Sequence, residues 1–169
     1  YDGFKTGRWI NFKLSDVTAL KNRIPEIQHI APRNSSGVFG GSKAQLVNGQ
    51  KKGSYNIYGD FPIYTTIATK TIFDGGRFIN ESDIKDKRKV CVIGERTQQE
   101  LFKEDESPIG KFVRINGIHF RIIGVTKFVD GGGPGNDGDI YIPFTTYQRL
   151  YNTGEYVDFL LVAAYPTAD

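Results

Sequence analysis

The side chains that most often carry out chemistry are few in this sequence and stand apart from one another. The single cysteine, Cys91, lies inside the apolar run 90–94, where a buried thiol is more common than a nucleophile. The two histidines, His29 and His119, are far apart in the chain, and neither has a neighbour at metal-ligand spacing. We therefore expect no metal site and no nucleophilic centre.

Acidic residues and glycines are the remaining candidates for a catalytic or nucleotide site. The acidic residues that could form a pair for acid–base catalysis are Asp83, Asp86, Glu104, Asp105 and Glu106. They lie in stretches typical of turns, so we expect surface roles for them. Neither Gly94 nor the glycine run at 131–135 has the spacing of a phosphate-binding motif. The sequence therefore predicts no cofactor, and a flexible surface loop at 131–135 that could become ordered on contact with a partner.

The composition is that of an ordinary globular domain. With 169 residues, 38% hydrophobic and 24% charged, the chain is long enough to bury a core and too apolar to be disordered. The net charge of +3 is spread along the chain and is too small to indicate nucleic-acid binding. No stretch approaches the roughly 20 apolar residues of a membrane-spanning helix. The absence of methionine suggests that this sequence is a piece of a longer protein.

The first half of the chain predicts a mixture of short helices and strands. The expected elements are a helix over 16–23 capped by Ser15 and stopped by Pro25, an extended segment over 27–32, a loop over 34–37, a hairpin formed by 44–47 and 54–58, and a brief helix that begins at Pro62. An extended segment over 71–73 follows.

The second half contains the clearest signals. The apolar run 90–94 predicts a buried central strand, and 95–102 predicts a helix packed on it. The segment 112–122 predicts a hairpin with a type I′ turn at Asn116-Gly117. Its apolar face comprises Val113, Ile115, Ile118, Phe120 and Ile122, and its wet face Arg114, His119 and Arg121. A strand over 140–143, a helix over 145–151 and a strand over 157–163 complete the chain.

An ordered series of short motifs runs through the middle of the chain. In order, the motifs are Gly75-Gly76-Arg77-Phe78, Asp83, Val90-Cys91-Val92-Ile93-Gly94, Leu101-Phe102, Pro108-Ile109-Gly110-Lys111, Phe120-Arg121-Ile122-Ile123-Gly124-Val125 and Ile140-Tyr141-Ile142-Pro143. This series closely resembles the periplasmic core of the MacB-type ABC-transporter permeases. Their order and spacing over 59–143 carry the resemblance, rather than any single motif. The segment 16–32 also matches the N-terminal portion of the family.

The resemblance implies an α+β fold with mixed sheets and short helices. It implies a βαβ-type membrane-proximal part, here incomplete, and an inserted mixed α/β subdomain rich in β-hairpins. We expect residues 1–169 to be one extracytoplasmic domain. Within it, 1–58 belongs to the membrane-proximal subdomain, 59–155 forms the smaller subdomain, and 156–169 returns as a strand toward the first.

The family-motif residues have structural roles on this interpretation. They are Gly76, Arg77, Phe78, Asp83, Gly94, Phe102, Gly110, Gly124 and Pro143. Glycines at 75 and 76 would allow a tight turn, Phe78 would fill the core, and Arg77 would pair with an acidic group such as Asp83. Direct contact with a partner is the alternative role for them.

The resemblance also implies a function. The domain would be non-catalytic and would lie on the extracytoplasmic or periplasmic side of the cell (inner) membrane, flanked by membrane helices. It would transmit ATP-driven motion to a partner or substrate during efflux, peptide export or lipoprotein release. The implied partners are a second or paired permease copy, a cytoplasmic ATPase and a periplasmic adaptor protein.

An alternative function is a stand-alone extracytoplasmic module that binds peptide, glycan or lipid. It would require an aromatic pocket around Tyr55, Tyr58, Phe61 and Tyr64. A small hydrolase would require a clustered nucleophile and base, which the sequence does not offer.

Overall fold

The computed structural model describes residues 12–38, 40–127 and 138–166. The glycine run at 131–135 therefore lies outside the described residues. The strands are β1 (Phe12–Lys13), β2 (Ile27–Ser36), β3 (Ala44–Asn48), β4 (Lys51–Tyr55), β5 (Ile57–Asp60), β6 (Val90–Gly94), β7 (Phe112–Ile115), β8 (Ile118–Thr126), β9 (Ile140–Pro143), β10 (Tyr156–Val157) and β11 (Phe159–Ala164). The helices are α1 (Leu14–Arg23), α2 (Tyr64–Ile67), α3 (Glu81–Lys85), α4 (Glu95–Leu101) and α5 (Phe144–Tyr151).

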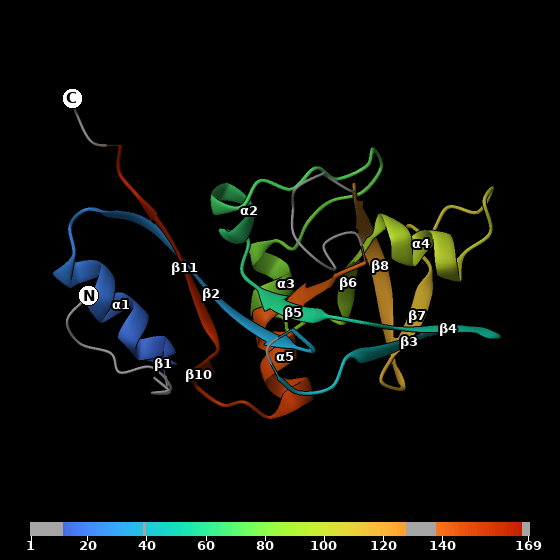
Figure 1. Ribbon diagram of the computed structural model, residues 1–169, viewed down its shortest axis with the longest axis horizontal. Helices are drawn as coiled ribbons and strands as arrows, with labels where there is room; N and C mark the ends of the chain where they lie inside the picture. The colour runs from blue at the N-terminus through green and yellow to red at the C-terminus, as the bar shows by residue number, and fades with distance from the viewer. Residues whose placement is uncertain (1–11, 39, 128–137, 167–169) are drawn as a thin grey trace.

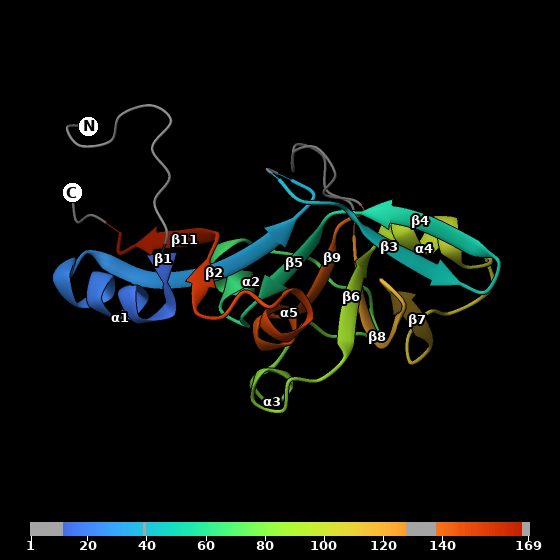
Figure 2. The same ribbon diagram turned by 90° about the horizontal axis from the view of Figure 1, so that it is seen from below.

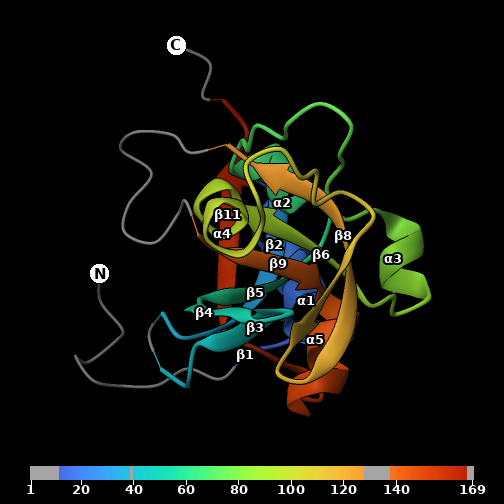
Figure 3. The same cartoon turned by 90° about the vertical axis from the view of Figure 1, so that its right-hand side faces the viewer.

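A mixed sheet of nine strands organises the fold. Its order is β11-β2-β5-β9-β6-β8-β7-β3-β4, and β1 pairs separately with β10. Neighbouring strands run antiparallel except for two parallel pairs, β5 with β9 and β6 with β8. The mixed sheet and short helices confirm the predicted α+β class. Figure 1 shows the helices placed around the sheet, and Figure 3 shows α3 standing to one side of it.

Strand β6 lies at the centre of the core, as its apolar run predicts. All five of its residues are buried. Cys91 and Ile93 belong to one apolar cluster, and Val90 and Val92 belong to another. Because successive side chains point to opposite faces of a strand, these clusters occupy the two faces of the sheet. Helix α4, predicted over 95–102, contacts β4, β6 and β8 and contributes Leu101 to the first cluster.

The hairpin of β7 and β8 has the predicted register and turn. Asn116 and Gly117 both have positive φ values, 49° and 85°, as a type I′ turn requires. Val113 lies opposite Phe120, and both are buried. Of the predicted apolar face, Ile118 alone is only partly buried, while Arg114, His119 and Arg121 are exposed.

Two predictions about the bounds of strands are wrong. Residues 34–36 were expected in a loop but continue β2, because the Asn34 side chain accepts a hydrogen bond from the Asp158 amide at 2.8 Å, which offsets the cost of its burial. The expected return strand 54–58 is divided at Asn56. Tyr55 pairs with Ala44 in β3, whereas Ile57 leaves the hairpin to pair with Ser36 and with Ile140.

The start of α1 also differs from the prediction. Lys13, not Ser15, occupies the cap position, and the Asp16 carboxylate accepts a hydrogen bond from the Lys13 amide at 2.9 Å. The carboxylate three residues inside the helix thus fixes the start, since it satisfies a backbone donor that the first turn leaves free.

The described chain begins and ends near the same end of an elongated sheet. Figure 2 shows β1, α1 and β11 at one end and β3, β4, α4 and β7 at the other. Strand β11 pairs with β2, and β2 pairs with β5. The predicted boundary between residues 58 and 59 falls within β5, and residues on both sides of it pair with β2. The division into 1–58, 59–155 and 156–169 stays a prediction.

Two family-motif glycines allow the segment 75–77 to lie directly on β8. A Cβ atom added at Gly76 would lie 2.8 Å from the Cα of Gly124, and one added at Gly124 would lie 2.3 Å from the Arg77 carbonyl oxygen. The Arg77 amide donates a hydrogen bond to the Ile123 carbonyl at 2.9 Å. Each glycine therefore provides the space that the opposite backbone occupies.

Gly124→Ala should destabilise the domain by about 1–3 kcal/mol, because the added methyl group must displace backbone rather than a flexible side chain. Gly40→Ala is the matched control, since a Cβ atom there meets nothing within 4 Å. The control should stay within about 0.5 kcal/mol of the parent. Urea unfolding measures both, and equal stability of the two variants would contradict the close approach.

Candidate functional site

Asp83 is the centre of a charged cluster on the surface of the domain. Its carboxylate accepts hydrogen bonds from Arg77 Nη1 at 2.7 Å and Nη2 at 3.2 Å, so the expected ion pair is present. Arg88 Nη1 approaches the same carboxylate at 3.4 Å. The Asp83 side chain is fully buried, whereas the two arginine side chains are 43% and 44% exposed. The arginines thus cover the carboxylate and keep outer faces in solvent.

Helix α3 positions this carboxylate. Asn80 caps the helix by accepting a hydrogen bond from the Asp83 amide at 3.0 Å, and Asp83 accepts one from the Asn80 amide at 2.9 Å. Burial by itself raises the pKa of Asp83. The hydrogen bonds from Arg77 and the Asn80 amide, together with the arginine charges, outweigh this effect, so the pKa lies below its ordinary value.

Other family-motif residues lie around the cluster or in the core beside it. Gly110 has a φ of +85°, and its amide donates to the Ile122 carbonyl at 2.8 Å, which holds the turn before β7 against β8. The Phe78 ring packs edge-on against Tyr141 at 5.7 Å between centroids. Three of the motif residues, Gly76, Arg77 and Gly110, thus line one hollow beside β8, while Phe78 packs against the core.

The three remaining motif residues lie at the ends of helices or strands elsewhere in the fold. Gly94 ends β6 and caps α4 with a φ of −75°, a conformation open to any residue. Phe102 ends α4 and is buried in the core. Pro143 ends β9 opposite Asp60 and precedes α5. Their positions are compatible with structural roles, which stay predictions.

A second buried ion pair was not found by sequence reasoning. The Arg33 guanidinium donates to both carboxylate oxygens of the fully buried Asp60, one of them at 3.0 Å. The rings of Tyr58 and Tyr64 both lie 3.9 Å from the guanidinium carbon. Burial by itself lowers the pKa of Arg33. The charge and hydrogen bonds of Asp60 outweigh this effect, so the pKa lies above its ordinary value and Arg33 stays charged. This pair joins β2 to β5.

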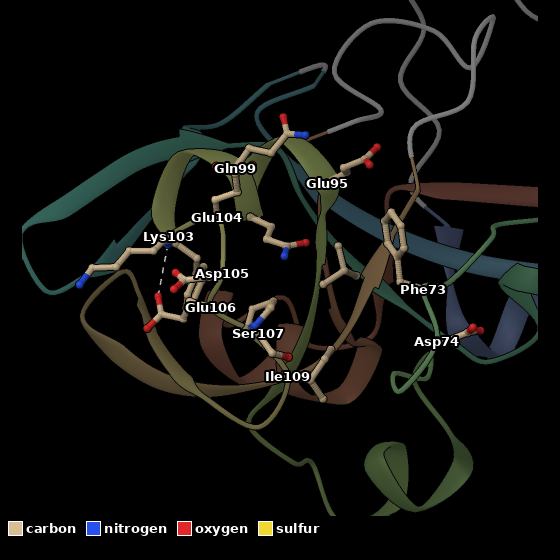
Figure 4. A pocket seen from close by; sticks show the side chains of 14 residues that line it. Phe73, Asp74, Glu95, Gln99, Lys103, Glu104, Asp105, Glu106, Ser107 and Ile109 are labelled. Carbon is tan, nitrogen blue, oxygen red and sulfur yellow. Dashed lines mark hydrogen bonds between the residues drawn. The ribbon is translucent and has the colours of Figure 1, made fainter.

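An acidic cleft of about 720 Å³ lies between α4 and the loop 103–109. Figure 4 shows Glu95 and Gln99 of α4 on one side, Glu104 and Asp105 beside them, and Phe73 and Ile109 across from them. Phe102 and Val125 also line it, so the cleft has an apolar lining with an acidic rim. Glu106, at the edge of the cleft, forms an ion pair in which Lys111 Nζ lies 2.7 Å from its carboxylate oxygen.

A basic hollow of about 670 Å³ lies on the other side of Ile109, which lines both cavities. Its charged lining residues are Arg77, Arg88 and Arg121. Sequence reasoning missed Arg88 because it lies in the charged run 85–89, which resembles an ordinary solvated turn. It placed Arg121 on the wet face of a hairpin but could not show what the side chain faces.

The cysteine and the two histidines considered for chemistry in the sequence do not come together. Cys91 is buried, and burial raises the pKa of its thiol, so it stays protonated. His29 pairs with Ala163 in the sheet, and His119 lies exposed opposite Arg114. Within the part of the chain that the structure describes, no group of three His, Cys, Asp or Glu side chains could hold a metal ion. No helix of the described ranges is long and apolar enough to cross a membrane.

Asp83→Asn should reduce the free energy of unfolding at pH 7 by about 2 kcal/mol, because it removes hydrogen bonds to a charged group. A carboxyl pKa that is lower in the folded state adds stability above the unfolded pKa of about 3.9 and loses it as the pH falls through the folded pKa. The parent and Asp83→Asn should therefore converge in acid, as urea unfolding across a pH series would measure. The exposed Asp105→Asn is the control and should change stability by less than about 0.5 kcal/mol at pH 7. A constant difference between parent and Asp83→Asn down to low pH would contradict the lowered pKa.

Comparison with known proteins places this arrangement in a family. A family model described as the MacB-like periplasmic core domain matches residues 2–169. The macrolide export ATP-binding/permease protein MacB of Bdellovibrio bacteriovorus is 33% identical over 167 residues, or 98% of this chain and 24% of that protein. The pyoverdine export ATP-binding/permease protein PvdT of Pseudomonas putida is 25% identical over 154 residues, or 89% of this chain and 22% of that protein. The chain thus spans about a quarter of the length of these relatives.

Solved structures share the fold. The periplasmic region of MacB from Actinobacillus actinomycetemcomitans superposes with a TM-score of 0.77 at 26% identity, over 97% of this chain and 70% of that one. The extracellular domain of the transporter YknZ from Gram-positive bacteria gives a TM-score of 0.76 at 18% identity, over 92% of this chain and 74% of that one, which shows the fold alone. From the family model over almost the whole sequence, we conclude that the chain belongs to the MacB-like periplasmic core domain family of ABC-transporter permeases.

Proposed function

We propose that this domain transmits ATP-driven motion of the membrane helices of a longer permease to a partner or substrate during export. The observation that carries the proposal is the family match over residues 2–169. Relatives in this family are named as export ATP-binding/permease proteins. On this proposal the domain lies outside the cytoplasm at the inner or cell membrane. ATP is hydrolysed on a cytoplasmic domain, and the partners are a second permease copy and an adaptor protein.

The arrangement of the sheet supports a mechanical role. Strands β1 and β11 lie near the end at which the described chain begins and ends, β10 pairs with β1, and β3 and β4 lie at the far end. Hydrogen-bonded strands connect the two ends without interruption. The Arg33–Asp60 pair ties β2 to β5 along this path. A displacement applied at the first end would therefore move the far end as part of one stiff unit.

Transmission also requires two states with different contacts. Two hollows offer surfaces that could change partners, because the acidic cleft lies beside α4 and the basic hollow lies beside β8 and the start of β6. The proposal assigns to these surfaces a contact that is made in one state of the transport cycle and released in the other.

Replacing residues 12–166 by a flexible linker in the full-length transporter should abolish export and spare basal ATP hydrolysis, since the proposal places hydrolysis on another domain. Export from cells and ATPase activity of the purified transporter measure the two effects. Export at the level of the intact transporter would overturn the proposal.

A double substitution provides a sharper test that retains the domain. Arg33→Met with Asp60→Asn removes both buried charges and leaves the strands in place, whereas Arg33→Met alone leaves an unpaired buried carboxylate. The double variant should lower the export achieved per ATP hydrolysed, while the exposed Arg114→Gln control should not. Urea unfolding of the isolated chain establishes that the double variant folds. An unchanged ratio in the folded double variant would exclude this pair as part of the path.

The alternative, a stand-alone binding module, receives no support from its expected aromatic pocket. Tyr55 is buried in one core cluster and Tyr64 in the other, and Phe61 stacks on Phe144 at 4.6 Å between ring centroids. The full-length gene distinguishes the two functions. Hydrophobic segments before Tyr1 and after Asp169 would support a permease, and their absence would support the binding module.

A further inference from the structure

The basic hollow has the composition of an anion site. Three arginines line it, Arg77, Arg88 and Arg121, and its other lining residues are glycines and aliphatic side chains. No carboxylate belongs to the described lining. Outside this lining, Asp83 pairs with Arg77 and Arg88, and Asp86 pairs with Arg88, so the three arginines exceed the two nearby carboxylates by one positive charge.

Two of the arginines are held in place from behind. Asp83 accepts from Arg77 and Arg88, and its own side chain is fully buried. Arg88 also contacts the exposed Asp86 at 3.2 Å. Each guanidinium has five N–H donors, and these contacts together with the Phe78 carbonyl leave donors free on both. The two side chains are therefore partly ordered before any ligand arrives, which reduces the entropy cost of binding.

Arg121 has no such partner. It is exposed on the outer face of β8, and no described residue provides it with a carboxylate. Its Nη2 atom lies 3.8 Å from the position that a Cβ atom would take on Gly110, so the guanidinium rests beside bare backbone at the edge of the hollow. All of its donors remain available to a ligand.

Phosphate-type oxyanions fit this arrangement. A planar guanidinium offers paired N–H groups that match the oxygens of phosphate, and the resulting charge-assisted bonds are stronger than neutral ones. The apolar walls formed by Val90, Ile109 and Ile123 limit the water that competes for the same donors. The acidic cleft beyond Ile109 repels anions, so the hollow is the favoured one of the two cavities.

We propose that the hollow lined by Arg77, Arg88 and Arg121 binds a phosphate group, either as a free oxyanion or as the headgroup of a lipid. This site does not depend on the proposed role in transmission. Arg121 contributes the charge that no carboxylate of the fold neutralises, and Asp83 orients the other two arginines toward the same ligand.

Titration of the 169-residue chain with inorganic phosphate at constant ionic strength, followed by NMR chemical shifts, tests the site. Resonances of residues around the hollow, such as Gly75 and Gly110, should shift and saturate, and chloride should not reproduce the effect. Arg121→Gln should weaken binding at least about tenfold, the factor that corresponds to one charge-assisted hydrogen bond.

Arg114→Gln is the matched control, because it removes the same charge from the exposed face of the same hairpin outside the hollow. It should bind phosphate like the parent. Equal thermal stability of the two variants establishes that Arg121→Gln is folded. Equal binding by the parent and folded Arg121→Gln, or shifts that chloride reproduces, would overturn the proposal.

A second arm distinguishes the source of the phosphate. Sedimentation with phosphatidylcholine vesicles that contain phosphatidic acid, compared with pure phosphatidylcholine vesicles, tests the lipid headgroup. Binding to the anionic vesicles that Arg121→Gln loses and Arg114→Gln retains would support the lipid as ligand. Saturable binding of inorganic phosphate without vesicle binding would support a soluble one, and binding of neither would overturn the site.

Discussion

Strands β6 and β9 have apolar side chains on both faces, and the need to cover both faces places most of the other elements. Ile93 and Ile142 belong to one apolar cluster, whereas Val92 and Tyr141 belong to the other. Helices α4 and α5 pack over the first face, and Leu101 and Tyr147 are buried there. Tyr64 and Ile79, from the long connection between β5 and β6, cover the second. A surface strand would not impose this requirement, because one of its faces could remain in water.

This two-sided burial explains why the charged groups of the family motif are close to the core. The segment 75–77 lies directly against β8, and Gly76 and Gly124 permit that approach. Arg77 then reaches Asp83. The Asp83 carboxylate is buried, and burying it without a partner would cost free energy. The Arg33–Asp60 pair satisfies the same condition between β2 and β5. The Arg33–Asp60 pair joins strands that are distant in sequence, which suits a domain proposed to move as one unit.

The same junctions shape the surface. Ile109 separates an acidic cleft from a hollow lined by arginines, and the two cavities share the turns before β7 and around residues 73–77. A single element thus places opposite charges side by side, so an anion and a cation would be directed to different positions on one face. Arg77 and Arg88 both form ion pairs with the buried Asp83 carboxylate, and both keep N–H donors exposed at the surface.

The sequence by itself determined the elements whose signals are local. The buried run 90–94, the Asn116-Gly117 turn and the alternation along 112–122 depend on neighbouring residues, and the structure confirms all of them. The Arg77–Asp83 pair was also within reach, because the residues are close in the chain and share one motif.

Tertiary structure alone decided the remainder. Arg33 and Asp60 are 27 residues apart, and only the pairing of β2 with β5 brings them together. Distant contacts also decide the position of Asn34, which continues a strand because the backbone amide of Asp158 donates a hydrogen bond to its side chain. They likewise decide the role of Arg121, because the proposed anion-binding hollow also needs Arg77 and Arg88. Local propensity is a property of neighbours in sequence, whereas a buried charge or a cavity is defined by groups that meet only after the sheet has assembled.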